Sequence, residues 1–233
     1  MAECLLSGGD RVAVLDIASE RINALKDKFK DSLLVYPCDV SDAEAVKRSV
    51  SDAESQWGAA DIAIHNACLC LFTDLIHTSD DDYRHVFDVN FQGAVNLTRA
   101  VLPSMIERGR GKVCFTSSGV GVMGFVNISA YASSKGAIES FARCMDIENR
   151  PFGVSFHILH PPLTRTTSSR PLPVPQEFMA DPVKVGQGLA KNIGKKRFII
   201  CHSFVQRIQT RMAYLYGLKL GRLMSRMTAK VPD

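Results

Sequence analysis

Residues 112–135 read KVCFTSSGVGVMGFVNISAYASSK, and the order of structure in them indicates the fold. The first five residues form a short apolar run that predicts a buried strand, and a helical pattern begins at Tyr131. Ser117, Ser118 and Gly119 follow the strand directly, so they stand at the edge of a sheet where its strands end. The segment therefore predicts a strand, a polar turn and a long helix.

The same alternation runs along the rest of the chain. Apolar runs predict further strands at residues 11–15, 33–36, 62–65, 154–159 and 197–201. Helical patterns occupy residues 17–30, 43–57, 80–107, 131–149 and 182–193. This alternation is typical of a parallel sheet with helices on both faces. It predicts an α/β fold with a Rossmann-like doubly wound sheet, which binds ligands at the carboxyl ends of its strands.

The composition is that of an ordinary globular protein. Of 233 residues, 46% are hydrophobic and 22% charged, which excludes a disordered chain and suffices for one core. Seven cysteines without metal-site spacing predict reduced thiols, and we expect Cys68 and Cys70 to pack as small residues rather than act as a redox pair. The sequence has no apolar run of about 18 residues and no signal peptide, so we expect a cytoplasmic protein.

Tyr131 and Lys135 lie four residues apart on the predicted helix and therefore share one face. A phenol with a pKa near 10 is a weak base at neutral pH. An ammonium group one turn away stabilises the phenolate and is expected to lower the pKa of Tyr131. Alone, the spacing also fits a surface tyrosine stacked on a lysine side chain.

Asp16 ends the first predicted strand. In Rossmann units an acidic residue at the end of the second strand binds the hydroxyls of the adenosine ribose. An aspartate here also fits the N-cap of the helix that follows. Gly8 and Gly9 precede a strand rather than a helix, so they do not form a phosphate-binding loop.

Taken together, these residues resemble the short-chain dehydrogenase/reductase family. The resemblance covers residues 10 to 166 and rests on motifs in the family's order and spacing. The motifs are Asp16, Cys38-Asp39-Val40, Asn66-Ala67, Val89-Asn90, Ser118, Tyr131-x-x-x-Lys135 and residues 161–166. The chain is similar to the family over most of its length, and the resemblance implies a site for each motif.

The resemblance implies four catalytic roles. Tyr131 is the general acid/base at the substrate oxygen, and Ser118 holds and polarises that oxygen. Lys135 lowers the pKa of the tyrosine and binds the nicotinamide ribose. Asn90 positions a water that connects Lys135 to solvent. A hydride then moves between the cofactor and a carbinol carbon, so the expected reaction interconverts an alcohol and a ketone.

The resemblance assigns the other motif residues to the cofactor. Asp16 holds the ribose diol and repels a 2′-phosphate, which implies a preference for NAD(H), with NADP(H) as the alternative. The remaining contacts are assigned to Asp39 and Val40 at the adenine, Asn66 and Ala67 in the cofactor cleft, and Thr166 at the carboxamide.

Three departures from the family pattern affect the cofactor site. The first strand and its Thr-Gly-x-x-x-Gly-x-Gly loop are absent, and with them the helix N-terminus that receives the diphosphate. Cys68 stands where the family has glycine after Asn-Ala, and Pro162 stands where it has glycine after Pro161. Because the catalytic set is intact, we interpret the chain as an N-terminally truncated form of a working enzyme. The alternative is a non-catalytic pseudoenzyme or scaffold.

The C-terminal part of the chain is strongly basic. Residues 191–230 hold ten Lys or Arg and no Asp or Glu. Residues 204–228 form an amphipathic pattern that predicts a basic helix, broken at Gly217 or Gly221. We divide the chain into a Rossmann-like domain at 1–202 and a basic extension at 203–233. The extension fits a peripheral membrane contact or a subunit contact in a homo-oligomer, whereas nothing in it is typical of nucleic-acid binding.

The prolines and polar residues of segment 161–175 predict an irregular loop over the catalytic edge. The resemblance implies an apolar or lipid-like alcohol or ketone as substrate, because the family members that act on lipid carbonyls are similar in having a membrane-directed C-terminal region. The partners expected are thus a small-molecule substrate, a second copy of the chain and a membrane surface.

Overall fold

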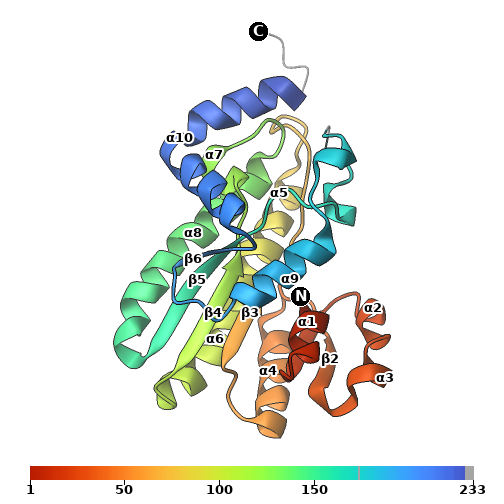
Figure 1. Cartoon of the computed structure of the whole chain (residues 1–233), viewed down its shortest axis with the longest axis vertical. Coiled ribbons are helices and arrows are strands. Elements are labelled where there is room, and N and C mark those ends of the chain that lie inside the picture. Colours follow the sequence, from red (N-terminus) through yellow and green to blue (C-terminus); the bar gives the residue numbers. More distant parts are fainter. Residues whose placement is uncertain (173, 229–233) are drawn as a thin grey trace.

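The computed structural model describes residues 1–172 and 174–228, apart from the side chains of Arg21 and Thr228. Pro173 of the predicted loop and the last five residues of the predicted extension lie outside this description. The six strands of the described chain are parallel and form two sheets (Figure 1). One sheet pairs β1 (Val12–Asp16) with β2 (Leu33–Pro37). The other has the order β3 (Ile62–His65), β4 (Gly111–Thr116), β5 (Val154–His160) and β6 (Ile199–Cys201).

Two hydrophobic clusters cover opposite faces of the larger sheet. Val113 and Phe115 of β4 belong to the cluster formed with α4 (Ala43–Trp57), α6 (Gly93–Glu107) and α8 (Ser129–Asn149). Cys114, between them, belongs to a cluster with α9 (Pro182–Asn192), against which α1 (Ala2–Ser7) packs. Because neighbouring residues of a strand point to opposite faces, this division confirms the predicted doubly wound arrangement.

The two sheets do not pair with each other within the described chain. Residues of β1 and β3 line one cavity. The edge of each strand that faces this cavity has no backbone hydrogen-bond partner among the described residues. Such edges are open positions for hydrogen bonding by an added strand or a ligand. The carboxyl ends of β1, β3, β4 and β5 all lie at this cavity, which places the candidate site there.

Two predicted helices differ from the observed ones. Residues 17–30 were expected to form one helix, but the structure has α2 (Glu20–Asn23), α3 (Lys26–Phe29) and a 3-10 turn, Lys30–Ser32. Short helices depend on burying an apolar face, and no described side chain of this segment is buried. The helix expected at 80–107 is divided into α5 (Asp80–Phe87), a π-helical turn (Asp88–Gln92) and α6.

The predicted C-terminal helix is present as α10 (Phe204–Thr228), and it crosses the top of the molecule beside α7 (Val120–Met123) in Figure 1. The helix is kinked at Tyr216, not at the two glycines that the sequence indicated. A Cβ on Gly217 would lie 2.8 Å from the Val122 carbonyl oxygen, and one on Gly221 would meet the Met123 carbonyl. These glycines therefore allow α10 to approach the backbone of α7.

The loop before α9 is more ordered than expected. Segment 161–175 was expected to be irregular, but it contains a 3-10 turn, Thr167–Ser169, and a second turn, Gln176–Phe178, follows it. Thr166 and Ser169 form a capping box at the first turn, which compensates for backbone groups left without partners.

Among the described residues, no helix is both long and apolar enough to cross a bilayer.

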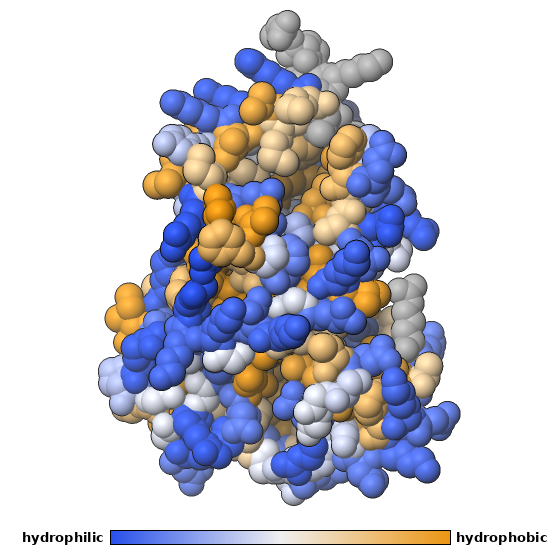
Figure 2. All heavy atoms as spheres, in the orientation of Figure 1, coloured by the Kyte–Doolittle hydropathy of each residue, from blue (hydrophilic) through white to orange (hydrophobic). Residues whose placement is uncertain are grey.

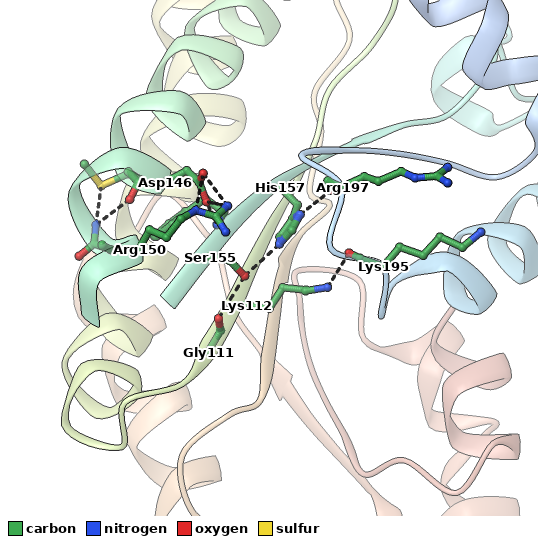
Figure 3. A network of polar contacts seen from close by, with 11 residues as sticks. Gly111, Lys112, Asp146, Arg150, Ser155, His157, Lys195 and Arg197 are labelled. Carbon is green, nitrogen blue, oxygen red and sulfur yellow. Dashed lines mark hydrogen bonds and ion pairs between the residues drawn. The ribbon is translucent and has the colours of Figure 1, made fainter. Parts of the chain in front are cut away.

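A network of hydrogen bonds connects β4, β5 and the segment before β6 at the amino-terminal end of the larger sheet (Figure 3). The Lys112 ammonium donates to the carbonyls of Ile193 and Lys195 at 2.8 and 2.9 Å. His157 bonds the Arg197 carbonyl at 2.7 Å and the Ser155 hydroxyl at 3.0 Å. These bonds fix the segment that leads into β6 at the end of the sheet opposite the cavity, so His157 has a structural role.

Candidate active site

A cavity of about 2200 Å³ runs between the two sheets and extends to α10. Apolar side chains form most of its lining. The cavity brings together the predicted site residues Asp16, Asp39, Val40, Asn66, Ala67, Ser118, Tyr131, Lys135 and Thr166. Nine of the ten residues predicted from the sequence thus face one space, although they come from separate parts of the chain.

Tyr131, Ser118 and Lys135 form the polar centre of this cavity. Tyr131 and Lys135 lie on the first two turns of α8, and Ser118 follows β4. Ser118 lies close enough to the Tyr131 hydroxyl to lower its pKa, and the Lys135 Nζ lies 5.6 Å from the centre of the tyrosine ring. The Lys135 side chain is almost fully buried and donates to the Thr116 carbonyl at 2.9 Å. An ammonium has three donors, so two are left for groups entering the cavity.

The direction of the Tyr131 pKa is a correction to the sequence analysis. We expected Lys135 to lower it, but burial raises the pKa of Tyr131 well above 10, and the charges of Cys68 and Cys70 raise it further. The Ser118 hydrogen bond acts in the opposite direction without reversing the shift. Desolvation disfavours the phenolate, so the hydroxyl is a proton donor at neutral pH.

Asn90 is placed differently from the expectation. It is fully buried in the π-helical turn and does not line the cavity. Its Oδ1 accepts from the Leu69 N–H at 2.8 Å, and its Nδ2 donates to the Leu69 carbonyl at 3.0 Å and to the Ser134 hydroxyl at 2.9 Å. Because both amide hydrogens are used, Asn90 holds the loop after β3 against α8 rather than positioning a water beside Lys135.

The residues expected at the adenosine end lie where β1 and β2 terminate. Asp16 is exposed, and one of its carboxylate oxygens accepts from the Ala18 N–H at 2.8 Å. Asp39 is exposed too, and it accepts from the backbone and the hydroxyl of Ser41, bonds that lower its pKa. The Asp39 carboxylate is therefore ionised at neutral pH. The N-cap of α2 is Ser19 and not Asp16, so the Asp16 carboxylate holds the turn before this helix and stands at the cavity edge.

The nicotinamide end is lined from β3, β4 and the 161–172 segment. The Thr116 hydroxyl donates to Asn66 Oδ1 at 2.9 Å, which fixes the side chain that follows β3. Thr166 caps the 3-10 turn on the other side of the cavity. Pro161 and Pro162 line the same wall and offer no backbone donor.

The residues present fit the two ends of a nicotinamide dinucleotide but not its centre. Gly119, Gly121 and Gly124 match Gly-x-Gly-x-x-Gly after β4, a spacing the sequence analysis did not consider. A Cβ on Gly121 would lie 2.8 Å from the Lys135 Cβ, so this glycine allows α7 to pack on α8. The helix that follows, α7, has only four residues. Within the described chain, no glycine-rich turn leads from a strand into a long helix at the cavity.

Two further groups of residues lie against the predicted site. Cys68 and Cys70, expected to be small packing residues, have their sulfur atoms 3.5 Å apart on the cavity wall. On the buried side of α8, Glu139 pairs with His160 at 2.9 Å and accepts from the Tyr214 hydroxyl at 2.5 Å. The spacing Tyr131, Lys135, Glu139 could have indicated that Glu139 shares this helix face.

Comparison with known proteins agrees with this arrangement. The sequence profile described as short chain dehydrogenase matches residues 1–176. The oxidoreductase UcpA of Escherichia coli K12 is 31% identical over 193 residues, which cover 81% of this chain and 73% of UcpA. The NADP-dependent 3-hydroxy acid dehydrogenase YdfG of Salmonella typhi is 29% identical over 143 residues, 61% of this chain and 58% of YdfG.

A solved short-chain dehydrogenase from Streptomyces avermitilis superposes with a TM-score of 0.81 at 23% identity, covering 100% of this chain and 92% of that one, which shows the shared fold. The chain belongs to the short-chain dehydrogenase/reductase family. It is similar to the oxidoreductases of that family, and the match to YdfG spans less than two thirds of that protein's length.

Proposed function

We propose that this protein is a nicotinamide-dependent oxidoreductase that interconverts an alcohol and a ketone, with Tyr131 as general acid/base. The observation that carries the proposal is that Ser118, Tyr131 and the buried Lys135 lie together at the cavity, with the Lys135 Nζ 5.6 Å from the tyrosine ring. When bound, the nicotinamide supplies or accepts the hydride. The alternative, a non-catalytic scaffold, does not account for a buried lysine at this position.

Three side chains have separate roles in the proposed ketone reduction. Ser118 donates a hydrogen bond that holds the carbonyl oxygen, and Tyr131 transfers its proton to that oxygen. Lys135, whose position is fixed by the Thr116 carbonyl, directs its remaining donors toward the ribose hydroxyls of the cofactor. Its positive charge also stabilises the phenolate that is left when the proton has moved.

Asp16 supports a preference for NAD(H). Its carboxylate stands at the end of β1, where it would accept hydrogen bonds from the ribose diol and repel a 2′-phosphate. Asp39 and Val40 would contact the adenine. The name of YdfG specifies NADP, so the preference is an individual property of this chain and Asp16 is the residue to test.

The proposed substrate is apolar or lipid-like. The cavity wall opposite Tyr131 includes Leu163, Leu172, Phe178 and Met179 from the loop before α9, and Met212 and Leu220 from α10. These side chains favour a ketone with a hydrocarbon chain, because apolar surface is released from water on binding.

An assay of ketone reduction tests the function. The chain is incubated with NADH or NADPH and a series of aliphatic ketones of increasing length, and loss of reduced nicotinamide is followed by absorbance. We expect faster reaction with NADH and with longer ketones, and Asp16→Ala should reduce the difference between the cofactors. A folded chain that oxidises neither cofactor with any ketone would contradict the proposal.

A second proposal concerns α10 as a peripheral membrane contact. The helix exposes Phe204, Val205, Leu215, Leu218 and Met227, each more than 60% accessible. Figure 2 shows hydrophobic and hydrophilic surface interleaved over this helix at the top of the molecule. Exposed basic residues accompany the apolar ones: Arg211, Lys219, Arg222 and Arg226. This combination favours an anionic lipid surface, and a subunit contact in a homo-oligomer is the competing explanation.

A further inference from the structure

Cys68 and Cys70 form a pair of thiols on the wall of the cavity. Their sulfur atoms lie 3.5 Å apart, and both side chains are only partly buried. Both line the cavity from which a small molecule would reach Tyr131. Other described cysteines do not share this arrangement: Cys38, Cys114 and Cys201 are buried, and Cys144 is exposed on α8.

The backbone between the two cysteines is held on both sides. Leu69 donates its N–H to Asn90 and accepts from the same amide, at 2.8 and 3.0 Å. Asn90 is in turn bonded to Ser134 of α8. The residue that separates the cysteines is therefore fixed to the core, which holds the two sulfur atoms in contact without further ordering.

The surroundings distinguish the two thiols. A hydrogen bond from Cys70, followed by the charge of Lys135 and a hydrogen bond from Tyr131, lowers the pKa of Cys68 to about 6 despite burial. The hydrogen bond to Cys68 and burial raise the pKa of Cys70. At neutral pH the pair consists of one thiolate and one thiol, the combination that exchanges with disulfides.

We propose that Cys68 and Cys70 are a reversible dithiol–disulfide site, oxidised by a small-molecule disulfide that enters the cavity. The Cys68 thiolate attacks one sulfur of the disulfide RSSR, its S–S bond breaks, and RS⁻ leaves with the electron pair. The released thiolate takes the proton of Cys70. The Cys70 sulfur then attacks Cys68, expelling the second RS⁻. The two cysteines are oxidised, and RSSR is reduced to RSH and RS⁻.

The geometry allows this bond without a large rearrangement. A disulfide requires a sulfur separation of about 2.05 Å, so the sulfurs must approach by about 1.5 Å. A ring closed over a single intervening residue is strained, and strained disulfides are easily reduced, so the oxidised form should be reversible. Oxidation would also remove the thiol charges that raise the pKa of Tyr131.

Peptide mapping by mass spectrometry tests the site on the intact chain. The folded protein is equilibrated with oxidised and reduced glutathione at several ratios, quenched with an alkylating agent and digested. We expect the peptide holding residues 68–70 to lose two hydrogens as the ratio rises, and to regain them with dithiothreitol. This readout does not depend on enzymatic activity, so it is independent of the proposed function.

Variants identify the attacking sulfur. Cys70→Ser should leave a stable glutathione adduct on Cys68, because the second displacement is lost. Cys144→Ser is the matched control and should form the 68–70 disulfide as the parent chain does. The proposal is overturned if Cys68 and Cys70 stay reduced, or carry only separate glutathiones, under conditions that modify Cys144 in the parent chain.

Discussion

At the scale of single residues, the burial of Tyr131 sets the protonation state of the proposed general acid. A phenol whose pKa lies well above 10 is protonated throughout the neutral range, so it is ready to donate to a ketone. The reverse reaction needs the phenolate, which this environment disfavours. The site is therefore better suited to reduction than to oxidation at neutral pH.

The raised pKa predicts the pH dependence of the two directions. Because the acid form persists up to the raised pKa, ketone reduction should be nearly constant between about pH 7 and pH 9. Alcohol oxidation should rise about tenfold per pH unit over the same range, as the fraction of phenolate increases. Initial rates at saturating substrate measure both. A reduction rate that halves near pH 7 would show that the pKa of Tyr131 is not raised.

Sequence reasoning at this scale succeeded where one helix fixes the spacing. Tyr131 and Lys135 share a face because they are four residues apart, and both lie at the cavity. It did not predict the position of Asn90, whose buried side chain bonds Leu69 and Ser134 and does not line the cavity. It also gave the wrong direction for the pKa of Tyr131, because burial is set by long-range packing that spacing does not contain.

At the scale of elements, several polar contacts and two close approaches of its glycines attach α10 to the core. The Tyr214 hydroxyl reaches the buried Glu139 carboxylate, and the glycines of α10 contact α7. Burial alone would raise the pKa of Glu139, but hydrogen bonds from His160 and Tyr214 lower it below its usual value. The helix is thus connected to the same α8 that carries Tyr131.

Removing the Tyr214 hydroxyl should destabilise the protein. Tyr214→Phe leaves Glu139 without one donor, and a hydrogen bond to a charged group contributes about 1.5–3 kcal/mol. We expect a loss of this size in the free energy of unfolding by urea. Since the pKa of Glu139 is lowered, this contribution is present at neutral pH and is lost as pH falls through that pKa. Tyr216→Phe, at a half-exposed tyrosine of the same helix, is the control and should have no effect.

The basic face of α10 predicts binding to anionic vesicles. Each basic residue near such a surface contributes about 1 kcal/mol, so reversing four charges should abolish co-sedimentation with phosphatidylserine vesicles. The variant carries glutamate at Arg211, Lys219, Arg222 and Arg226. The control carries glutamate at four exposed cations away from α10, namely Lys26, Lys30, Lys47 and Arg48, and should still sediment. If the parent chain does not sediment with vesicles and the charge-reversed variant dissociates to monomers, the result would favour the subunit contact.

The elements themselves were largely predictable from hydrophobic periodicity. The helix at 43–57 and the strand at 62–65 have the predicted bounds, because each has a clear apolar face and a turn on either side. The prediction of one helix at 17–30 was wrong, because helical propensity alone does not stabilise a continuous helix without a buried apolar face. We predicted the kink of α10 at Gly217 or Gly221, but it lies at Tyr216. The two glycines allow close packing against α7.

At the scale of the whole molecule, the opening between β1 and β3 has consequences for cofactor affinity. The described residues contact both ends of a dinucleotide, whereas the diphosphate has no helix N-terminus or glycine-rich turn to receive it. The alternation of strands and helices along the chain could be predicted from the hydrophobic pattern. The size and lining of the cavity could not, because they depend on how α1, α9 and α10 pack.

The missing diphosphate contacts predict weak binding of NADH. We expect a dissociation constant of about 1 mM for this chain by isothermal titration calorimetry, because several charge-assisted hydrogen bonds are not available. Asp16→Ala should weaken the binding further. A micromolar constant for the parent chain would show that the described residues hold the diphosphate in a way this account does not include.

The most direct test of the site uses reduced nicotinamide mononucleotide, which lacks the adenosine half. Its oxidation by an aliphatic ketone depends on Tyr131, Ser118 and Lys135 but not on contacts to a diphosphate bridge. We predict ketone-dependent oxidation of this donor by the parent chain, and a rate at least about 10²-fold lower in Tyr131→Phe. Equal rates in the two chains, or no oxidation by a parent chain with a native circular dichroism spectrum, would contradict the assignment of Tyr131 as the general acid.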